Sequence, residues 1–272
     1  DMGNTYNSLD GASNARGESS TQTAPSDDSA SFEAQNRLDI EAMKRDRDLP
    51  ALARHWARAV GPYRYPYHFK WMGRPIIQVP QDLVAMQELI WEIKPEAIVE
   101  TGVARGGSLV FYASMLHLID QPAKVIGVDI DIRSHNREAI EGHRMASRIE
   151  LIQGSSIAQE TFAAVKAAVG NASRVIVCLD SHHEKGHVLE ELRLYSSLVQ
   201  KGSYLVVFDT LLEFLPESYS QGRPWGPGNG PLSAIDEFLK ENDRFVVDTD
   251  IDAKLQITVA PHGWLRCVGD LT

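Results

Sequence analysis

Apolar and polar residues alternate in a regular order from residue 81 to the C-terminal end of the chain. Short apolar runs, which predict strands, come at residues 98–101, 125–129, 149–152, 175–179, 204–209, 245–248 and 255–259. Apolar residues at helical spacing lie between them and predict helices at residues 83–93, 108–118, 137–147, 160–168, 188–199 and 232–240. Buried strands that alternate with helices are typical of a mostly parallel sheet with helices on both faces. The pattern therefore predicts an α/β fold with seven strands, of which the last two form an antiparallel edge pair.

The first eighty residues do not follow this pattern. Residues 1–30 are rich in Ser, Gly, Asn, Thr and Asp and have no apolar period, which predicts a flexible polar tail or an arm that orders against a partner subunit. Residues 31–80 are expected to form a helical and aromatic N-terminal cover, with Pro50 separating two helices. The Pro- and aromatic-rich residues 61–80 either cover the core or flank a bound cofactor. Residues 81–272 form the predicted sheet domain.

Composition narrows the classes of function. The net charge is −10, with 37 acidic and 27 basic residues, which argues against a nucleic-acid partner because phosphate binding needs clustered Lys and Arg. The sequence has no run of 18 apolar residues, so no membrane span is expected. No segment is typical of a signal peptide. Two cysteines, Cys178 and Cys267, make no disulfide framework. We therefore expect a cytoplasmic protein with neither nucleic acid nor membrane as a partner.

A glycine-rich segment, VETGVARGGS at residues 99–108, follows the first strand of the sheet and precedes a helix. Glycines let backbone N–H groups approach a ligand, and the N-terminus of a helix favours anionic groups. The segment lacks the G-K-[ST] of a P-loop and the G-x-G-x-x-G of dinucleotide-binding sites. It predicts a cofactor-binding loop, or else a turn that needs small residues at a helix start. The candidate cofactor contacts here are Glu100, Thr101, Gly102, Gly107 and Ser108.

Asp129 ends the second strand, 27 residues after Gly102. An acid at this place commonly accepts hydrogen bonds from ribose hydroxyls, and the alternative is a side chain that caps the next turn. Asp131, two residues on, is expected to point elsewhere. Ser155 and Ser156 follow the third strand and could lie near an adenine edge. The cofactor is therefore expected to contain adenosine; NAD and S-adenosylmethionine (SAM) both fit, and seven strands favour SAM.

Titratable residues gather in LDSHHEKGHVLEEL, residues 179–192, after the fourth strand. In a doubly wound sheet the first and fourth strands are neighbours, and ligands bind beyond their carboxyl ends. Asp180 at the fourth strand and Asp209 after the fifth should therefore face one crevice. Two carboxylates suit Mg²⁺, although each could simply cap the following turn. Asp180 is also a candidate cofactor contact.

His183 lies three residues past Asp180, at the expected mouth of the crevice. A neutral imidazole there could accept a proton from an attacking hydroxyl. His182 is expected to be a solvent-facing or supporting residue, and His187 to begin a helix in a structural role.

A later Gly- and Pro-rich loop contains Trp225. This loop is expected to form either a substrate-side wall, with the indole as a flat apolar face, or a structural loop.

Five segments taken together carry a resemblance to a known family: WMGRPIIQVPQDLVAMQELIWEIKPEAIVETGVARGGS, LDSHHEKGHVLEEL, YLVVFDT, RPWGPGNGPLSAIDEFL and KLQITVAPHGWL. From about residue 65 to its end, the chain resembles the cephalosporin hydroxylase-type family of SAM-dependent O-methyltransferases, which includes rhamnosyl and macrolide-sugar methyltransferases. The resemblance implies a Rossmann-like class I methyltransferase fold for residues 81–272. It also implies a Mg²⁺ ion and a homo-oligomer.

The resemblance also implies roles for single residues. The metal ligands of the family fall on Asp180 and on the pair at positions 208 and 209, and its catalytic histidine falls on His183. Position 208 departs from the pattern, because Phe stands where an acid is common. Either Asp180 and Asp209 suffice together with water and substrate oxygens, or this member works without a metal.

The expected function is SAM-dependent methylation of a sugar hydroxyl on a glycosylated natural product, with His183 as the general base. One alternative is a non-sugar acceptor, such as a catechol or a hydroxylated β-lactam. Another is a catalytically silent binding subunit, which the absence of an acid at Phe208 suggests. An NAD-dependent dehydrogenase is disfavoured by the spacing of the glycines.

Overall fold

The computed structural model describes residues 28–270. The chain divides into two units, residues 1–38 and 39–272. The first unit is described only from residue 28, where helix α1 (Asp28–Arg45) begins. The tail predicted over residues 1–30 therefore lies outside the described residues, except for its last three, which are helical. No helix within residues 28–270 is long and apolar enough to cross a membrane.

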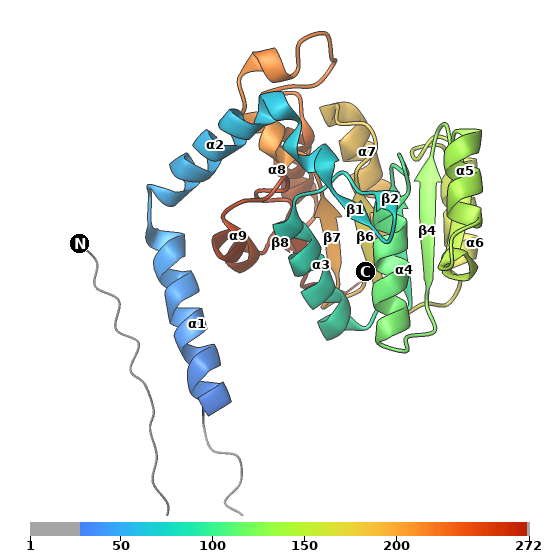
Figure 1. The fold of residues 1–272 in the computed structure, drawn as a ribbon, viewed down its shortest axis with the longest axis horizontal. Coiled ribbons are helices and arrows are strands. Elements are labelled where there is room, and N and C mark those ends of the chain that lie inside the picture. Colours follow the sequence, from blue (N-terminus) through green and yellow to red (C-terminus); the bar gives the residue numbers. More distant parts are fainter. Residues whose placement is uncertain (1–27, 271–272) are drawn as a thin grey trace, which may run out of the picture. The chain divides into compact units, whose positions relative to one another are not determined.

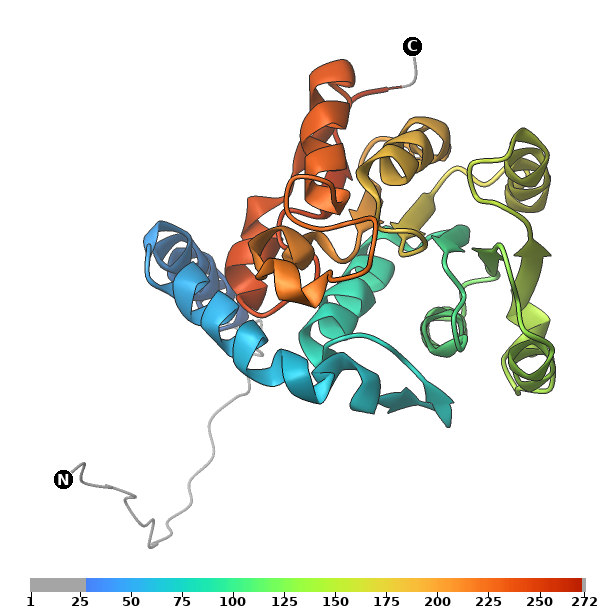
Figure 2. The same cartoon turned by 90° about the horizontal axis from the view of Figure 1, so that it is seen from above.

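A seven-stranded sheet forms the centre of the second unit, with the strand order β5-β4-β3-β6-β7-β9-β8 (Figures 1 and 2). The strands are β3 (Ala97–Thr101), β4 (Lys124–Asp129), β5 (Ile149–Gln153), β6 (Val175–Leu179), β7 (Tyr204–Val207), β8 (Phe245–Val247) and β9 (Trp264–Cys267). The first five of these are parallel, and β9 pairs antiparallel with both β7 and β8. The predicted Rossmann-like fold is confirmed, including the adjacent first and fourth strands, β3 and β6.

Helices cover both faces of this sheet, as Figure 2 shows from above. One face packs against α3 (Pro80–Ile93), α4 (Gly107–Leu118) and α5 (Ser134–Glu141). The other packs against α6 (Gln159–Val169), α7 (Lys185–Tyr195) and α8 (Pro231–Glu241). Alternate residues of a strand enter opposite cores: Ile98 lies in the first core, and its neighbours Ala97 and Val99 lie in the second. This alternation explains why the central strands are apolar throughout.

The prediction of the last strand was wrong. Residues 255–259 were expected to form it, but Leu255 ends helix α9 (Thr249–Leu255), residues 256–259 form no strand, and β9 lies farther on. The carboxylate of Asp248 accepts hydrogen bonds from the backbone N–H groups of Asp250 and Ile251, which caps a helix start. An antiparallel pair was expected correctly, but β9 inserts between β7 and β8.

The observed ends of one strand and one helix differ from the predicted ends. Strand β7 ends at Val207, two residues before its predicted end, and Asp209 has a left-handed backbone conformation with φ 57°. The helix expected at residues 137–147 ends at Glu141 and is followed by a separate 3-10 turn, Ala146–Arg148. Asp and Asn tolerate the left-handed region better than most residues, so a sharp turn at Asp209 is chemically reasonable.

Residues 39–80 pack beside the sheet. Pro50 lies in the first turn of α2 (Leu49–Val60), so the predicted break between two helices is confirmed. The aromatic segment after it forms two 3-10 turns, Gly61–Tyr63 and Tyr65–His68, and a short hairpin of β1 (Lys70–Trp71) and β2 (Arg74–Pro75), which was not predicted.

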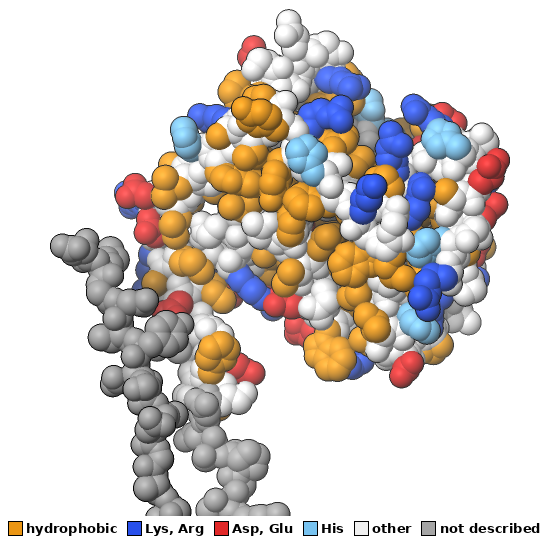
Figure 3. Space-filling view, in the orientation of Figure 1, with side chains coloured by type: hydrophobic (Ala, Val, Ile, Leu, Met, Phe, Trp, Pro, Cys, Tyr) orange, Lys and Arg blue, Asp and Glu red, His pale blue; other side chains and the backbone are white. Residues whose placement is uncertain are grey.

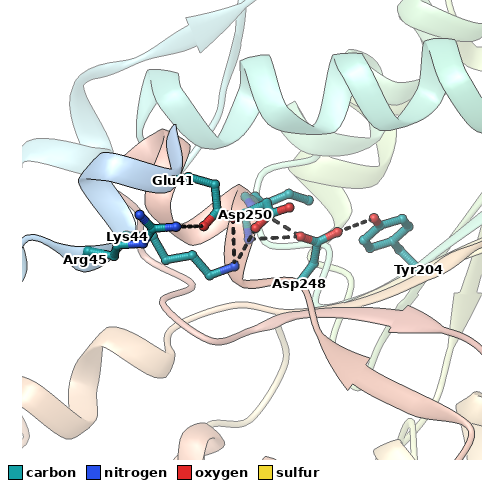
Figure 4. A network of polar contacts seen from close by, with 7 residues as sticks. Glu41, Lys44, Arg45, Tyr204, Asp248 and Asp250 are labelled. Carbon is teal, nitrogen blue, oxygen red and sulfur yellow. Dashed lines mark hydrogen bonds and ion pairs between the residues drawn. The ribbon is translucent and has the colours of Figure 1, made fainter. Parts of the chain in front are cut away.

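A polar network attaches the end of α1 to the sheet (Figure 4). Lys44 donates to Asp250 across 2.6 Å, in the first turn of α9. The neighbouring Asp248 accepts a hydrogen bond of 2.6 Å from the hydroxyl of Tyr204 on β7. The last turn of α1 is thereby joined through α9 to the sheet. The Lys44–Asp250 pair itself is exposed, so it contributes little to stability.

Asp82 is fully buried in the first turn of α3. One of its oxygens accepts the backbone N–H of Val259 across 3.0 Å and so holds the segment before β9; the other has no partner among the described residues. Burial raises the pKa of Asp82 from its usual 3.8 to about 7. The native state consequently holds a proton at pH 5 that the unfolded chain has lost.

We expect this carboxyl to reduce stability as the pH rises. Between pH 4 and 7 the folded state binds more protons than the unfolded state, so the free energy of unfolding falls by up to about 4 kcal/mol from this group. Asp82→Asn removes the titration. Urea denaturation of both proteins should show a smaller loss of stability from pH 5 to pH 8 in the variant. Equal losses would contradict the assignment.

Candidate active site

A cavity of about 270 Å³ lies at the carboxyl ends of β3, β6 and β7. Its wall on the β3 side is the glycine-rich loop, residues 102–108. Asp180, Ser181 and His183 line it after β6, and Asp209 lines it after β7. The N-terminal cover contributes Pro66, Tyr67, Pro75, Ile77 and Gln78. The aromatic segment is therefore part of the cavity wall, in addition to covering the core.

Close backbone contacts explain the glycines of the loop. Gly102 has φ 93°, and a Cβ there would lie 2.1 Å from the carbonyl oxygen of Asp180. A Cβ at Gly107 would lie 2.1 Å from the carbonyl oxygen of Pro75. Both distances are far below van der Waals contact, so only glycine lets the loop lie against its two neighbours. The outer part of the loop is held by Arg74, which donates to the carbonyl of Arg105.

Glu100 and Thr101 lie below the loop and do not line the cavity. Both are fully buried. The Glu100 carboxyl accepts hydrogen bonds from Ser108 across 2.5 Å and from Tyr112 across 3.1 Å. Burial raises the pKa of Glu100 to about 8. Of the five residues predicted from this segment, Gly102, Gly107 and Ser108 reach the cavity, and Glu100 supports Ser108 from the core.

Asp129 lies beside the loop and outside the cavity wall. One oxygen accepts the backbone N–H groups of Val103 and Ala104 across 2.9 and 3.3 Å, and the other accepts that of Asp131 across 3.0 Å. A carboxylate has about four acceptor directions, so these contacts leave capacity for a ligand. Asp131 itself is exposed, as expected.

Ser155 and Ser156 do not line the cavity. The Ser156 side chain is buried and lies 3.0 Å from Nε2 of His187. That imidazole also lies 3.4 Å from the hydroxyl of Ser181, which donates to the buried Glu191 across 2.7 Å. His187 therefore connects the ends of β5 and β6 to α7, which agrees with the structural role expected for it.

Asp180, His183 and Asp209 come together as predicted. One ligand atom from each lies within 4.8 Å of the others, and His183 Nε2 is 3.1 Å from Asp209 Oδ2. Desolvation raises the pKa of Asp180 well above its usual value, and the charges of Asp209 and Glu100 raise it further. Within residues 28–270, no Lys or Arg forms an ion pair with either carboxylate.

This donor set fits a divalent cation. Two half-buried carboxylates lie close together with His183 beside them and no Lys or Arg paired to either, and such an arrangement is relieved by a bound cation. Oxygen ligands of this kind suit Mg²⁺, which keeps several waters. Phe208 adds no ligand, because its side chain is buried in the core against the ring of Trp264, 6.2 Å between centroids.

Two further residues lie in or next to the cavity wall, and only one of them was predicted from the sequence. Gln78 is almost fully buried in the cavity wall, with Nε2 3.4 Å from Asp180 Oδ2 and with Oε1 unpaired in the described part of the chain. A single glutamine in a Pro-rich segment has no pattern that predicts a site. Trp225, predicted as a candidate wall residue, does not line the cavity; its ring centroid lies 5.2 Å from those of His182 and His183, edge to face, so it packs behind the titratable turn.

Comparison with known proteins adds family information to this geometry. The family model described as rhamnosyl O-methyltransferase/CmcI matches residues 63–268. Rhamnosyl O-methyltransferases of Mycobacterium bovis and Mycobacterium leprae are each 30% identical to this chain, over 201 and 199 residues. These matches cover 72% of this chain, and 76% and 81% of the two relatives.

Solved structures agree on the fold. A CmcI structure with Mg and SAM superposes with a TM-score of 0.54 at 20% identity, covering 75% of this chain and 78% of CmcI. An apo structure of CmcI gives 0.52 at 20% identity, covering 75% and 77%. The arrangement of the sheet and its helices therefore agrees with these structures although only 20% of the aligned residues are identical.

The approach of the loop to Asp180 predicts the result of adding one methyl group. Gly102→Ala should lower the free energy of unfolding by about 2 kcal/mol or more beyond the cost of a left-handed alanine alone, because its Cβ overlaps the Asp180 backbone. Gly73→Ala is the matched control, since Gly73 also has a left-handed φ, 87°, but open space around it. Urea denaturation measures both, and equal losses would mean that the loop is not held against Asp180.

Proposed function

The chain belongs to the rhamnosyl O-methyltransferase/CmcI family, and on that premise we propose that it transfers a methyl group from SAM to a sugar hydroxyl on a small glycosylated natural product. The observation that carries the proposal is the single cavity in which the glycine-rich loop meets Asp180, His183 and Asp209. The names of the mycobacterial relatives support a sugar acceptor, and the CmcI structure with Mg and SAM supports the cofactor.

SAM would lie along residues 102–108, where Gly107 and Ser108 at the start of α4 line the cavity. Asp129 already holds the backbone of Val103 and Ala104, and from there it could accept the ribose hydroxyls. Ser155 and Ser156, at the end of β5, remain candidates for the adenine side on account of sequence position alone. The sulfonium would then face the acidic end of the cavity, and opposite charges favour that orientation.

The reaction is a displacement at the methyl carbon. The acceptor oxygen forms the new C–O bond, the S–C bond breaks with its electrons going to sulfur, and S-adenosylhomocysteine leaves. The hydroxyl proton passes to His183. In-line placement of oxygen, carbon and sulfur supplies much of the acceleration, because reacting groups held in alignment avoid the entropic cost of meeting.

Asp209 suits His183 to this task. When Nε2 carries the hydrogen that faces Asp209, Nδ1 is free to accept the proton of the acceptor. The nearby carboxylate then stabilises the imidazolium that forms, as it does in other carboxylate–histidine pairs. Trp225 packs edge-on against the same ring and restricts its orientation.

Asp180 and Asp209 would hold Mg²⁺, with water or acceptor oxygens completing its shell. A bound cation would lower the pKa of a coordinated hydroxyl. Because position 208 is a phenylalanine and not an acid, this chain offers two carboxylates for binding Mg²⁺. Gln78, with a free amide oxygen beside Asp180, is positioned to accept a hydrogen bond from a ligand in the same cavity.

Methyl transfer from SAM to a panel of acceptors, read by mass spectrometry, tests the proposal. We expect rhamnosides to be methylated and a catechol and a hydroxylated β-lactam not to be. Transfer only to the latter two would contradict the sugar acceptor. Tight SAM binding with no transfer to any hydroxyl would instead favour a silent binding subunit.

Loss of the proposed base should separate catalysis from binding. His183→Ala is expected to lower kcat by about 10² or more, with little change in the Kd for SAM, because general-base catalysis contributes about 10²–10⁴. His182→Ala, which removes the neighbouring imidazole, serves as the control and should retain most activity. A His183→Ala enzyme with full turnover would exclude the base assignment.

Loss of one proposed ligand should weaken binding of a divalent cation. Asp209→Asn is expected to raise the Kd for Mn²⁺, used as a spectroscopic substitute for Mg²⁺, by about tenfold or more, because the site loses one of two charges. Electron paramagnetic resonance counts free Mn²⁺ directly. Asp243→Asn, an exposed acid outside the cavity, is the control; equal affinities in both variants would exclude a site at Asp209.

The ribose contact can be tested by affinity alone. Asp129→Ala should raise the Kd for SAM by about tenfold or more, because hydrogen bonds to a charged group are worth about 1.5–3 kcal/mol. Calorimetric titration measures this, with the exposed Asp131→Ala as the matched control. Unchanged SAM binding in Asp129→Ala would show that the carboxylate only supports the loop.

A further inference from the structure

The candidate active site carries opposite charges on two of its sides. Asp180 and Asp209 line it after β6 and β7, and Arg105 lines it from the glycine-rich loop after β3. Arg105 is the only Lys or Arg among the described residues of the cavity wall. The proposed methyl transfer does not use it. A ligand with both cationic and anionic groups would find a partner for each in this cavity.

The guanidinium of Arg105 is free to bind a ligand. The side chain is exposed, and it forms no hydrogen bond or ion pair with any residue from 28 to 270. Burial lowers the pKa of the neighbouring Arg74, and the charge of Arg105 lowers it further. The two guanidinium groups are therefore close enough to repel each other, and neither is paired with a carboxylate of the described chain. An anion bound at Arg105 would relieve this repulsion.

Three other side chains fix the backbone that presents Arg105. Asp129 accepts the N–H of Ala104 across 3.3 Å, and Asn136 donates to the carbonyl of Ala104 across 2.9 Å. Arg74 donates twice to the carbonyl of Arg105, across 3.0 and 2.5 Å. Ala104 has a left-handed φ of 45°, which is unfavourable for alanine. Such strain persists where surrounding contacts over-determine it, and it gathers at ligand sites; here those contacts leave the Arg105 side chain unpaired at the cavity.

The surroundings of Arg105 are also positive. Figure 3 shows Lys and Arg side chains gathered over the part of this face where the β1–β2 hairpin, α4 and α5 lie, although the chain has a net charge of −10. Helix α4 begins at Gly107, and its first two residues line the cavity. The positive end of the helix dipole therefore adds to the field of Arg105. This side of the cavity favours an anionic group.

On the basis of the proposed function, we infer that Arg105 binds the carboxylate of the methionine part of SAM and is a specificity-determining residue for the cofactor. SAM carries a sulfonium, an ammonium group and one carboxylate. The side with Asp180 and Asp209 suits the two cations, and Arg105 suits the carboxylate. A guanidinium can hold a carboxylate through two parallel hydrogen bonds. Opposite charges on two sides of one cavity thus determine which way the cofactor lies.

An anionic group on the acceptor is the alternative partner. The acceptor hydroxyl is proposed to bind at His183 and Asp209, which follow β6 and β7, whereas Arg105 follows β3. SAM is proposed to lie along residues 102–108, the segment that contains Arg105. The cofactor is therefore the ligand that this side chain fits better, and a loss of acceptor affinity is an outcome of the test below.

The test compares two ligands by calorimetry on the full chain: S-adenosylhomocysteine and its decarboxylated counterpart, which keeps the adenosine, the sulfur and the amine. The wild-type protein should bind S-adenosylhomocysteine more tightly. Arg105→Gln should raise the Kd for S-adenosylhomocysteine by about fivefold or more, because a charge-assisted pair is lost, and leave the Kd for the decarboxylated ligand unchanged. Arg105→Lys, which keeps the charge, should retain most of the affinity.

Arg144→Gln is the matched control, because Arg144 is an exposed arginine outside the cavity wall. It should change neither Kd. Added salt should weaken binding of S-adenosylhomocysteine more in the wild-type protein than in Arg105→Gln, because salt screens the ion pair that only the wild-type protein can form.

The outcomes separate this inference from the proposed function. Equal losses for both ligands in Arg105→Gln would mean that the residue only supports the loop, and an unchanged Kd for S-adenosylhomocysteine would mean that the carboxylate binds elsewhere. Either result would overturn the inference while the methyltransferase stands, as would a loss of affinity for a rhamnoside alone. Binding of S-adenosylhomocysteine that depends on Arg105, without methyl transfer to any hydroxyl, would support the inference and contradict the function.

Discussion

The contact on which the site depends is the approach of the glycine-rich loop to the backbone of Asp180. Strands β3 and β6 are paired in parallel, and the N–H of Asp180 continues that pairing by donating to the carbonyl of Thr101 across 2.9 Å. At the next residue the chains would collide if Gly102 had a side chain. Because there is none, the glycine-rich loop and the acidic turn lie side by side. The proposed general base and the proposed methyl donor would then share one cavity.

A second constraint is the burial of acids. Asp82, Glu100 and Asp180 all have a raised pKa, chiefly because they are desolvated. Glu100 and Asp82 are held by hydrogen bonds and support the backbone around the cavity. Asp180 differs, because it faces the cavity and a second carboxylate. A cation bound there would favour the ionised form of Asp180, so burial of this carboxyl couples its charge to the proposed ligands.

Much of the fold and part of the candidate site could be predicted from the sequence, because apolar runs and residues at strand ends are local patterns. Continuous apolar runs gave the five parallel strands, and strand-end position placed Asp180 and Asp209 at one edge. Strand β9 could not be predicted, because the run at residues 255–259 is equally apolar and only the Asp248 cap and the pairing of Trp264 with Val206 decide between them. Gln78 enters the site through tertiary packing, which leaves no spacing pattern in the chain. The sequence shows that position 208 is a phenylalanine, but it does not predict that this side chain is buried against Trp264.

The central claim is that neighbouring strand ends bring the methyl donor and the base into one cavity, and a crystal structure with S-adenosylhomocysteine tests it most directly. The account predicts that the nucleoside lies along residues 102–108, with its sulfur facing His183 and Asp209. A nucleoside bound elsewhere, with His183 and Asp180 remote from its sulfur, would contradict the account.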